Sequence, residues 1–415
     1  MFSIKQLAEQ AKQASLQVSN LTDLEKRTTL NDMAIFLRYN RQSIITENQK
    51  DLDAAQENGL SPSMIDRLML NDDRIEDMAS AIEQIAKQDD PVGKIKSTKV
   101  LDNGLVVNKI SIPLGVIAMI YESRPNVTAD AAALCFKAGN SIILKGGKEA
   151  IHSNVAIGKI LHQALSNNKI DTGAIGIVSD TDRQHMAELL TLNDLVDLII
   201  PRGGEGLIKY VSENSRIPVI QHFKGVCHLY IDEGADIEKA IDILVNGKVQ
   251  RPGVCNALET LLVHDSIMQQ YSEQIAVALE SRNVKIHACE NSISHFNDAT
   301  LATDEDYDKE FLALEIAIRQ VNSFDSAIQH IQKFSSNHTE VIVTNNKTNA
   351  DEFVKRISSS VVMVNASSRF SDGGQLGLGA EIGISTSKLH AYGPMGAESL
   401  TTEKFVVLGD GQIRN

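Results

Sequence analysis

One cysteine lies in a motif whose neighbouring residues suit nucleophilic chemistry. The motif reads VQRPGVCN at residues 249–256, with Cys255 as its seventh residue. Pro252 restricts the backbone and Gly253 frees it, so the two residues predict a tight, defined turn. Arg251 adds a positive charge, and a positive neighbour increases the fraction of thiolate, the reactive form of a cysteine. A small buried cysteine in a connecting loop is the more common case, so the local pattern leaves both interpretations open.

Two glycine-containing turns follow predicted strands and precede predicted helices. In the first, Lys145 stands before Gly146 and Gly147, which allow close backbone approach, and the lysine can reach a ribose or a phosphate. In the second, RGGEG at 202–206, backbone amides at the start of the next helix can hold a pyrophosphate. The GxGxxG dinucleotide fingerprint is absent. Such turns also occur in sheets without ligands, so neither is specific by itself.

A third strand end, YESRPN at 121–126, carries polar side chains. Its position predicts Arg124 and Asn126 at the carboxyl edge of a sheet, where a side-chain amide can donate to an oxyanion. Asn126 is as compatible with a helix N-cap. Arg251 and Arg369 are candidates for binding an anionic substrate, and surface ion pairing is the alternative for each.

The pattern around these residues is that of an α/β protein. Residues 1–90 have helical periodicity throughout. Apolar strands then alternate with helices from Gly115, with a strand expected at 217–220, and a second series begins at Val226. Such alternation predicts parallel sheets covered on both faces, with ligands at the carboxyl ends of the strands. The acidic run at 304–308 is expected to be a solvated loop.

Two segments outside these series have β character. Residues 99–110, KVLDNGLVVNKI, are two β-prone runs around Asp-Asn-Gly, which predicts a hairpin. An isolated hairpin is marginally stable, so we expect it to pack on another surface, such as that of a second subunit. The tail, 365–415, is rich in Gly, Ser and Thr, with a last strand expected at 405–408. We expect this tail to wrap the body of the protein or a partner subunit.

Composition narrows the classes of function. The 415 residues are 42% hydrophobic, enough for two or three domains with cores, and the formal net charge is −14. This charge argues against nucleic acid or an anionic membrane as a partner. The cysteines are widely spaced and form no CxxC pair, which favours a reducing cytoplasm. We expect no metal site and no membrane span, since no run of 18 apolar residues occurs. Four histidines lack metal-ligand spacing and are interpreted as structural, with the last of them undecided: His222, His228, His264 and His390.

Taken in order, the motifs resemble one family over about three quarters of the chain. The segment QRPGVCNALETLLVH at 250–264 and the long motif at 364–396 resemble the gamma-glutamyl phosphate reductases, which belong to the aldehyde dehydrogenase superfamily. The segments at 113–154, 198–208 and 217–232 extend the likeness. The resemblance implies an aldehyde dehydrogenase-like α/β fold, with two doubly wound parallel-sheet domains and a small β oligomerisation element.

The resemblance also implies an organisation into three parts. Residues 1–225 would form a nucleotide-binding domain, with the hairpin 97–112 projecting from it as part of the oligomerisation element. Residues 226–365 would form the catalytic domain that carries Cys255. Residues 366–415 would return to the body and complete the oligomerisation element.

Site roles follow from the resemblance, residue by residue. Cys255 matches the nucleophile, and Asn126 matches the amide of the oxyanion hole. Lys145 matches a lysine at the adenosine ribose, where a 2′-phosphate would also lie. Gly203 and Gly204 match a turn that faces the pyrophosphate. Glu310 matches a glutamate that holds the nicotinamide ribose. Arg124, Arg251 and Arg369 remain the candidates for the substrate.

Two departures from related patterns are informative. Hydrolytic aldehyde dehydrogenases use a glutamate to activate water, and the matching stretch 221–225, QHFKG, has no carboxylate. A reductase that starts from an acyl phosphate needs no such base, so the absence favours reduction. The family usually has Arg where this chain has Tyr392, which implies an altered contact with substrate or a neighbouring subunit.

The implied reaction is the NADPH-dependent reduction of L-glutamyl 5-phosphate to glutamate 5-semialdehyde, the second step of proline biosynthesis from glutamate. The implied partners are glutamate 5-kinase and further copies of this chain, as a dimer or a tetramer. Three alternatives stay open: a related dehydrogenase or acyl-phosphate reductase with another substrate, a cofactor-free cysteine acyltransferase or hydrolase, and a non-catalytic scaffold.

Overall fold

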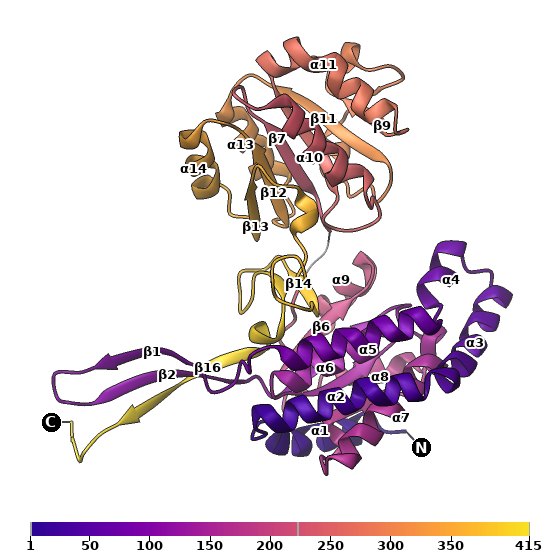
Figure 1. Ribbon diagram of the computed structural model, residues 1–415, viewed down its shortest axis with the longest axis vertical. Coiled ribbons are helices and arrows are strands. Elements are labelled where there is room, and N and C mark those ends of the chain that lie inside the picture. Colours follow the sequence, from indigo (N-terminus) through magenta and orange to yellow (C-terminus); the bar gives the residue numbers. More distant parts are fainter. Residues whose placement is uncertain (1, 222–223, 415) are drawn as a thin grey trace. The chain divides into compact units, whose positions relative to one another are not determined.

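The computed structural model describes residues 2–221 and 224–414, which divide into two compact units. The first unit comprises Met1–Gln221, Gly377–Gly383 and Met395–Asn415, and the second comprises His222–Leu376 and Ile384–Pro394. Each unit is built around its own parallel sheet (Figure 1).

The first unit opens with five helices, in the region where helical periodicity was predicted: α1 (Ile4–Val18), α2 (Asp23–Tyr39), α3 (Arg41–Glu57), α4 (Pro62–Leu68) and α5 (Asp72–Lys87). Side chains that accept hydrogen bonds from backbone amides mark the starts of α2 and α4. Ser61 caps α4 and accepts from the amide of Met64, with Pro62 in the first turn. Thr22 caps α2 in a capping box with Glu25.

The sheet of the first unit has four parallel strands in the order β5-β4-β3-β6. The strands are β3 (Val116–Tyr121), β4 (Ser141–Lys145), β5 (Ile175–Ile177) and β6 (Leu198–Arg202). The helices and 3₁₀ turns between and after them are α6 (Asn126–Lys137), η1 (Lys148–Ala150), α7 (Ile151–Asn167), η2 (Thr172–Ala174), α8 (Arg183–Leu189) and α9 (Glu205–Asn214). Every residue of β3 is buried, as expected for a strand covered on both faces. The strand expected at 217–220 is wrong in extent, because only an isolated bridge joins Val219 to Ile199.

A three-stranded antiparallel sheet extends from the first unit (Figure 1). It contains the predicted hairpin, β1 (Ile95–Val100) and β2 (Val106–Pro113), and the C-terminal strand β16 (Thr401–Leu408). β16 pairs with β2 from Thr401 opposite Pro113 to Leu408 opposite Val106. The hairpin therefore packs on the tail of its own chain, and its role in oligomerisation stays a prediction.

The second unit has a seven-stranded parallel sheet in the order β10-β9-β11-β8-β7-β12-β13. The strands are β7 (Cys227–Ile231), β8 (Leu258–His264), β9 (Lys285–Ala288), β10 (Thr300–Leu301), β11 (Glu315–Val321), β12 (Thr339–Val343) and β13 (Val361–Val364). The helices and 3₁₀ turns are α10 (Ile237–Val249), α11 (Asp265–Glu280), η3 (Ile293–His295), α12 (Asp304–Tyr307), α13 (Phe324–Phe334), α14 (Lys347–Arg356) and η4 (Ser368–Phe370). The acidic run at 304–308 is thus not a plain loop, because Thr303 and Asp306 close a capping box on α12.

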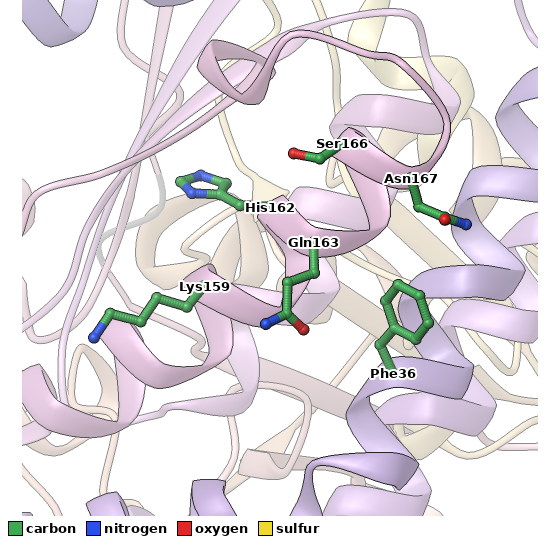
Figure 2. A pocket seen from close by; sticks show the side chains of 6 residues that line it. All are labelled: Phe36, Lys159, His162, Gln163, Ser166 and Asn167. Carbon is green, nitrogen blue, oxygen red and sulfur yellow. The ribbon is translucent and has the colours of Figure 1, made fainter.

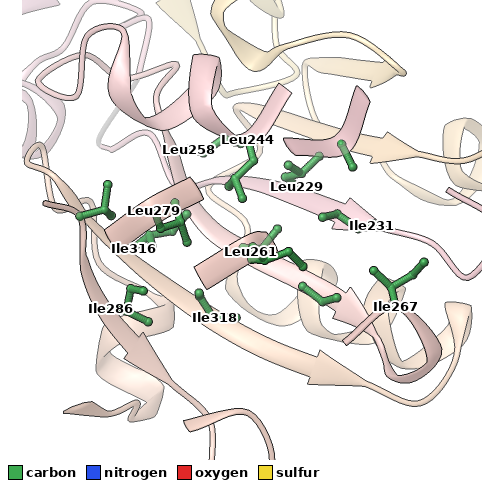
Figure 3. Close-up of a cluster of buried hydrophobic side chains, with 14 of the residues drawn as sticks. Leu229, Ile231, Leu244, Leu258, Leu261, Ile267, Leu279, Ile286, Ile316 and Ile318 are labelled. Carbon is green, nitrogen blue, oxygen red and sulfur yellow. The ribbon is translucent and has the colours of Figure 1, made fainter. Parts of the chain in front are cut away.

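Apolar side chains form a separate buried cluster on each face of this sheet. Figure 3 shows Leu229 and Ile231 of β7 with Leu261 of β8, together with Ile316 and Ile318 of β11, all of them buried. The remaining elements belong to the C-terminal segment: β14 (Gly383–Ser385), β15 (Gly393–Met395) and η5 (Ala397–Leu400). The predicted aldehyde dehydrogenase-like α/β fold, with two parallel sheets and a small β element, is confirmed.

Candidate active site

Cys255 lies in the turn between α10 and β8, where the periodicity of the flanking segments predicted it. The turn precedes β8, so it lies at the amino edge of the second sheet rather than at the carboxyl edge. Gly225 precedes β7, and Leu312 precedes β11, both at this same edge. Cys255 is half-buried, so its thiol is neither locked in the core nor fully hydrated.

Residues distant in sequence hold the Cys255 turn by hydrogen bonds. Ser368 Oγ donates to the carbonyl oxygen of Asn256 at 2.7 Å, and Asn256 Nδ2 donates to the carbonyl oxygen of Ser371 at 2.9 Å. The Cys227 thiol donates to the carbonyl oxygen of Cys255 itself at 3.2 Å. Burial raises the pKa of Cys227 well above its usual range, so this thiol keeps its proton. These contacts fix the backbone on both sides of the Cys255 side chain, and local sequence patterns gave no signal for them.

The turn also packs against the backbone that enters β7. A Cβ atom on Gly225 would lie 2.1 Å from the carbonyl oxygen of Cys255 and 2.8 Å from its Cα. Only glycine permits this approach. Gly225 ends the stretch 221–225, in which the sequence predicts that a water-activating carboxylate is missing; His222 and Phe223 of that stretch lie outside the described residues.

The structure brings Arg251 and Arg369 near Cys255. Arg369 Nε donates to Gln250 Oε1 at 2.9 Å, which anchors this side chain to the turn. Burial lowers the pKa of Arg369, and the charge of Arg251 lowers it further, while Asp372 and the Cys255 thiol act in the opposite direction. Arg251 and Arg369 thus place two positive charges close to the turn, an arrangement that suits an anionic substrate.

A buried ion pair lies directly behind the turn. Lys248 Nζ is 2.6 Å from Glu259 Oε2, and both side chains are fully buried. Burial raises the pKa of Glu259 to about 7, against the opposing charge of Lys248. Glu259 Oε1 also accepts from the amide of Leu312 at 3.2 Å. The pair therefore connects the end of α10 to the segment that carries Glu310, whose negative charge also raises the pKa of Glu259.

In the first unit, Asn126 is the first residue of α6 and not its N-cap. The cap position is Pro125, and Asn126 Nδ2 donates to Asp130 Oδ2 at 2.9 Å. The capping interpretation of Asn126 is therefore wrong. Burial raises the pKa of Asp130 to about 6, although the Asn126 hydrogen bond and the charge of Arg202 both lower it. Arg124 is exposed in the loop between β3 and α6.

Lys145 ends β4 and is half-buried, with Nζ donating to the carbonyl oxygen of Gly146 at 3.1 Å. Burial lowers its pKa, and the carboxylates of Glu149 and Asp180 oppose that effect. Glu149 accepts from the amide of Ser123 at 2.9 Å and so joins this turn to the end of β3. A lysine that loses solvation in this way is suited to bind an anion.

The Gly203–Gly204 turn lies between the end of β6 and the start of α9. β3 and β6 are neighbours although β4 follows β3 in the chain, so this turn lies at a topological switch point, where such sheets bind ligands. Glu122 Oε2 accepts from the amide of Gly204 at 2.9 Å. A backbone amide at the start of α9 therefore donates to an anionic oxygen of the protein itself.

Other polar groups lie outside these clusters. His228 is buried, with Nδ1 2.8 Å from Glu340 Oε2, and His264 accepts from the amide of Ser266 at the start of α11. Tyr392 donates its hydroxyl to the carbonyl oxygen of Ser358 at 2.6 Å. Among residues 2–221 and 224–414, no group of three or more His, Cys, Asp or Glu side chains is arranged to hold a metal ion. Within the same residues, no helix is both long and apolar enough to cross a bilayer.

A shallow groove of about 540 Å³ lies on the first unit, away from all the predicted site residues. Figure 2 shows its lining residues: Phe36, Lys159, His162, Gln163, Ser166 and Asn167. His162 Nε2 is engaged with the carbonyl oxygen of Ile175 at 2.5 Å. The groove is open to solvent, and none of its lining residues is a predicted site residue.

Comparison with known proteins supplies the family. Residues 3–294 match the model of the aldehyde dehydrogenase family. The gamma-glutamyl phosphate reductase of Colwellia psychrerythraea is 59% identical over 414 residues, which cover 100% of this chain and 99% of the relative. That of Idiomarina loihiensis is 54% identical over 411 residues, 99% of each chain. The crystal structure of gamma-glutamyl phosphate reductase from Thermotoga maritima matches with a TM-score of 0.98 and 42% identity, covering 100% of both chains.

Such identity over the whole chain far exceeds what a shared fold alone requires, and it confirms the resemblance that the motifs indicated. The chain therefore belongs to the aldehyde dehydrogenase family and, within it, to the gamma-glutamyl phosphate reductases.

Proposed function

We propose that this protein reduces L-glutamyl 5-phosphate to L-glutamate 5-semialdehyde and phosphate, with NADPH as the reductant and Cys255 as the nucleophile. The observation that supports this most is the Cys255 turn, held from both sides and flanked by Arg251 and Arg369. The family of the chain supports the same substrate, because its relatives are named for that reaction.

The Cys255 thiolate attacks the γ-carbonyl carbon of the acyl phosphate, and phosphate leaves as the thioester forms. Arg251 and Arg369 favour the thiolate before the attack and stabilise the departing phosphate after it. We assign the oxyanion contacts to the Cys255 amide and to Asn126. A thioester accepts hydride far better than a carboxylate does, which is the reason for covalent catalysis.

NADPH bound to the first unit would supply a hydride to the thioester carbon, giving the thiohemiacetal anion. Residues of the first unit fit such a dinucleotide: the Gly203–Gly204 turn already holds an anionic oxygen, and the partly desolvated Lys145 suits a ribose or a 2′-phosphate. We assign Glu310 to the nicotinamide ribose on the resemblance. Collapse of the thiohemiacetal returns the Cys255 thiolate and releases the semialdehyde.

The absence of a carboxylate at 221–225 supports the reductive direction, because the stretch lacks the glutamate with which hydrolytic aldehyde dehydrogenases activate water against the thioester. The thioester then persists long enough to be reduced. Arg124 remains a candidate for binding the substrate, and cytoplasmic location and a kinase partner remain predictions from the sequence.

The test is the reverse reaction. Purified protein is mixed with glutamate 5-semialdehyde, phosphate and NADP⁺, and the absorbance of the reduced cofactor is followed. We expect phosphate-dependent reduction that disappears in Cys255→Ala, while that variant still binds NADPH. Reduction without phosphate would indicate a hydrolytic dehydrogenase, and activity of Cys255→Ala near the wild-type level would refute the covalent mechanism.

A further inference from the structure

The Asn126 side chain is held by a carboxylate one helical turn further along α6. Asn126 Nδ2 donates to Asp130 Oδ2 at 2.9 Å. Asn126 is exposed and Asp130 is half-buried, whereas the other residues of α6 from Val127 to Lys137 are buried. The pair therefore lies where α6 meets solvent, with the carboxylate beside the amide that it holds.

The carboxylate of Asp130 can determine which end of the Asn126 amide faces it. A side-chain amide can present either its oxygen or its NH₂ group in a given direction, and only the NH₂ group donates. An ionised carboxylate accepts and does not donate, so Asp130 selects the orientation in which Nδ2 faces it. The nitrogen then has a second N–H group with which to donate to another acceptor.

A positive charge from the neighbouring strand supports the ionised form. Arg202, at the end of β6, lowers the pKa of Asp130 by its charge and lies 3.9 Å from Glu381. Burial acts in the opposite direction and has the larger effect on this pKa, which is about 6. Asp130 is thus mostly ionised at neutral pH and available as an acceptor.

We propose that Asp130 is a positioning residue that orients the amide of Asn126 for donation to the oxyanion. The inference rests on the proposed function, since it assumes the role assigned to Asn126. Asp130 does not touch the reacting atoms and acts only through Asn126.

The test compares Asp130→Leu and Asp130→Asn with the wild type. Leu cannot accept a hydrogen bond, whereas Asn keeps the size of Asp and can accept through its side-chain oxygen. We expect Asp130→Leu to lower kcat by about 10- to 100-fold, as for a misplaced catalytic group, with the dissociation constant for NADPH unchanged. Asp130→Asn should recover most of the lost activity, and it also serves if the Leu variant folds poorly.

The chain offers a matched control. Gln49 Nε2 donates to Asp53 Oδ1 at 2.7 Å, again from one helical turn to the next and again at the surface, but in α3, which carries none of the predicted site residues. Asp53→Leu removes the same kind of amide–carboxylate bond, and we expect kcat to stay within twofold of the wild type.

A double-mutant cycle with Asn126→Ala separates positioning from general destabilisation. We expect Asn126→Ala to lower kcat and Asp130→Leu to add nothing further in that background. A kcat for Asp130→Leu within twofold of the wild type, or losses that multiply in the double variant, would overturn the inference. Activity that survives Cys255→Ala would instead refute the proposed function, so the two failures are distinguishable.

Discussion

Replacing Gly225 with alanine tests whether the backbone at the start of β7 sets the position of Cys255. The added Cβ would lie 2.1 Å from the carbonyl oxygen of Cys255, whereas real Cβ atoms essentially never approach closer than 3.0 Å. One of the two backbone segments must therefore move by about 1 Å, and displacements of that size cost about 100-fold in rate when a reacting group is misplaced. Overpacking should also lower the free energy of unfolding by about 1–3 kcal/mol.

The assay measures kcat in the reverse reaction, the rate of Cys255 alkylation by iodoacetamide, and urea unfolding. We expect Gly225→Ala to lose about 100-fold in kcat, to alkylate at an altered rate, and to bind NADPH as the wild type does. Gly234→Ala is the matched control, because no atom lies within 4 Å of its added Cβ in the same unit. If Gly225→Ala kept kcat within twofold of the wild type, the reasoning that this contact positions the nucleophile would be refuted.

Three further predictions concern buried polar groups. Glu259→Gln should lower the free energy of unfolding by roughly 3–5 kcal/mol because it leaves the charge of Lys248 buried and uncompensated. In urea unfolding, the double variant Lys248→Met with Glu259→Leu should regain the lost free energy of unfolding. A double variant as unstable as Glu259→Gln would contradict this explanation. Ser368→Ala removes the donor to the Asn256 carbonyl oxygen and should cost about 1 kcal/mol of stability and several-fold in kcat; unchanged kcat would show that the turn does not need this bond. Burial raises the pKa of Asp130 to about 6, above its unfolded value, so its contribution to stability is complete below about pH 4 and is lost as the pH rises through 6. The urea midpoint of the wild type should therefore fall relative to that of Asp130→Asn as the pH rises from 4 to 7. A difference in midpoint that stays constant over this range would contradict a raised pKa of Asp130.

Local sequence patterns predicted much of the second unit well. The alternating strands and helices expected from Val226 onward are observed as β7, α10 and β8, and the turn expected at Pro252 and Gly253 lies between α10 and β8. Hydrophobic periodicity and a Pro-Gly break are local signals, which is why the sequence shows them. The acidic run at 304–308 was misjudged, since a four-residue helix has too little periodicity to show. Asn126 was ambiguous because an asparagine before a helical pattern suits a cap and a first-turn position alike.

The sequence alone determined the family, the α/β class and the identity of the candidate nucleophile, because these depend on motifs and periodicities that are complete within short segments. Only the tertiary structure decided what holds the nucleophile. Gly225, Cys227 and Ser368 reach the Cys255 turn from segments at least 28 residues away in the chain. The pairing of β16 with β2 likewise joins opposite ends of the sequence. Such contacts depend on which strands become neighbours. Strands pair through backbone N–H and C=O groups, which nearly all residues share, so a single sequence does not show which strands will pair.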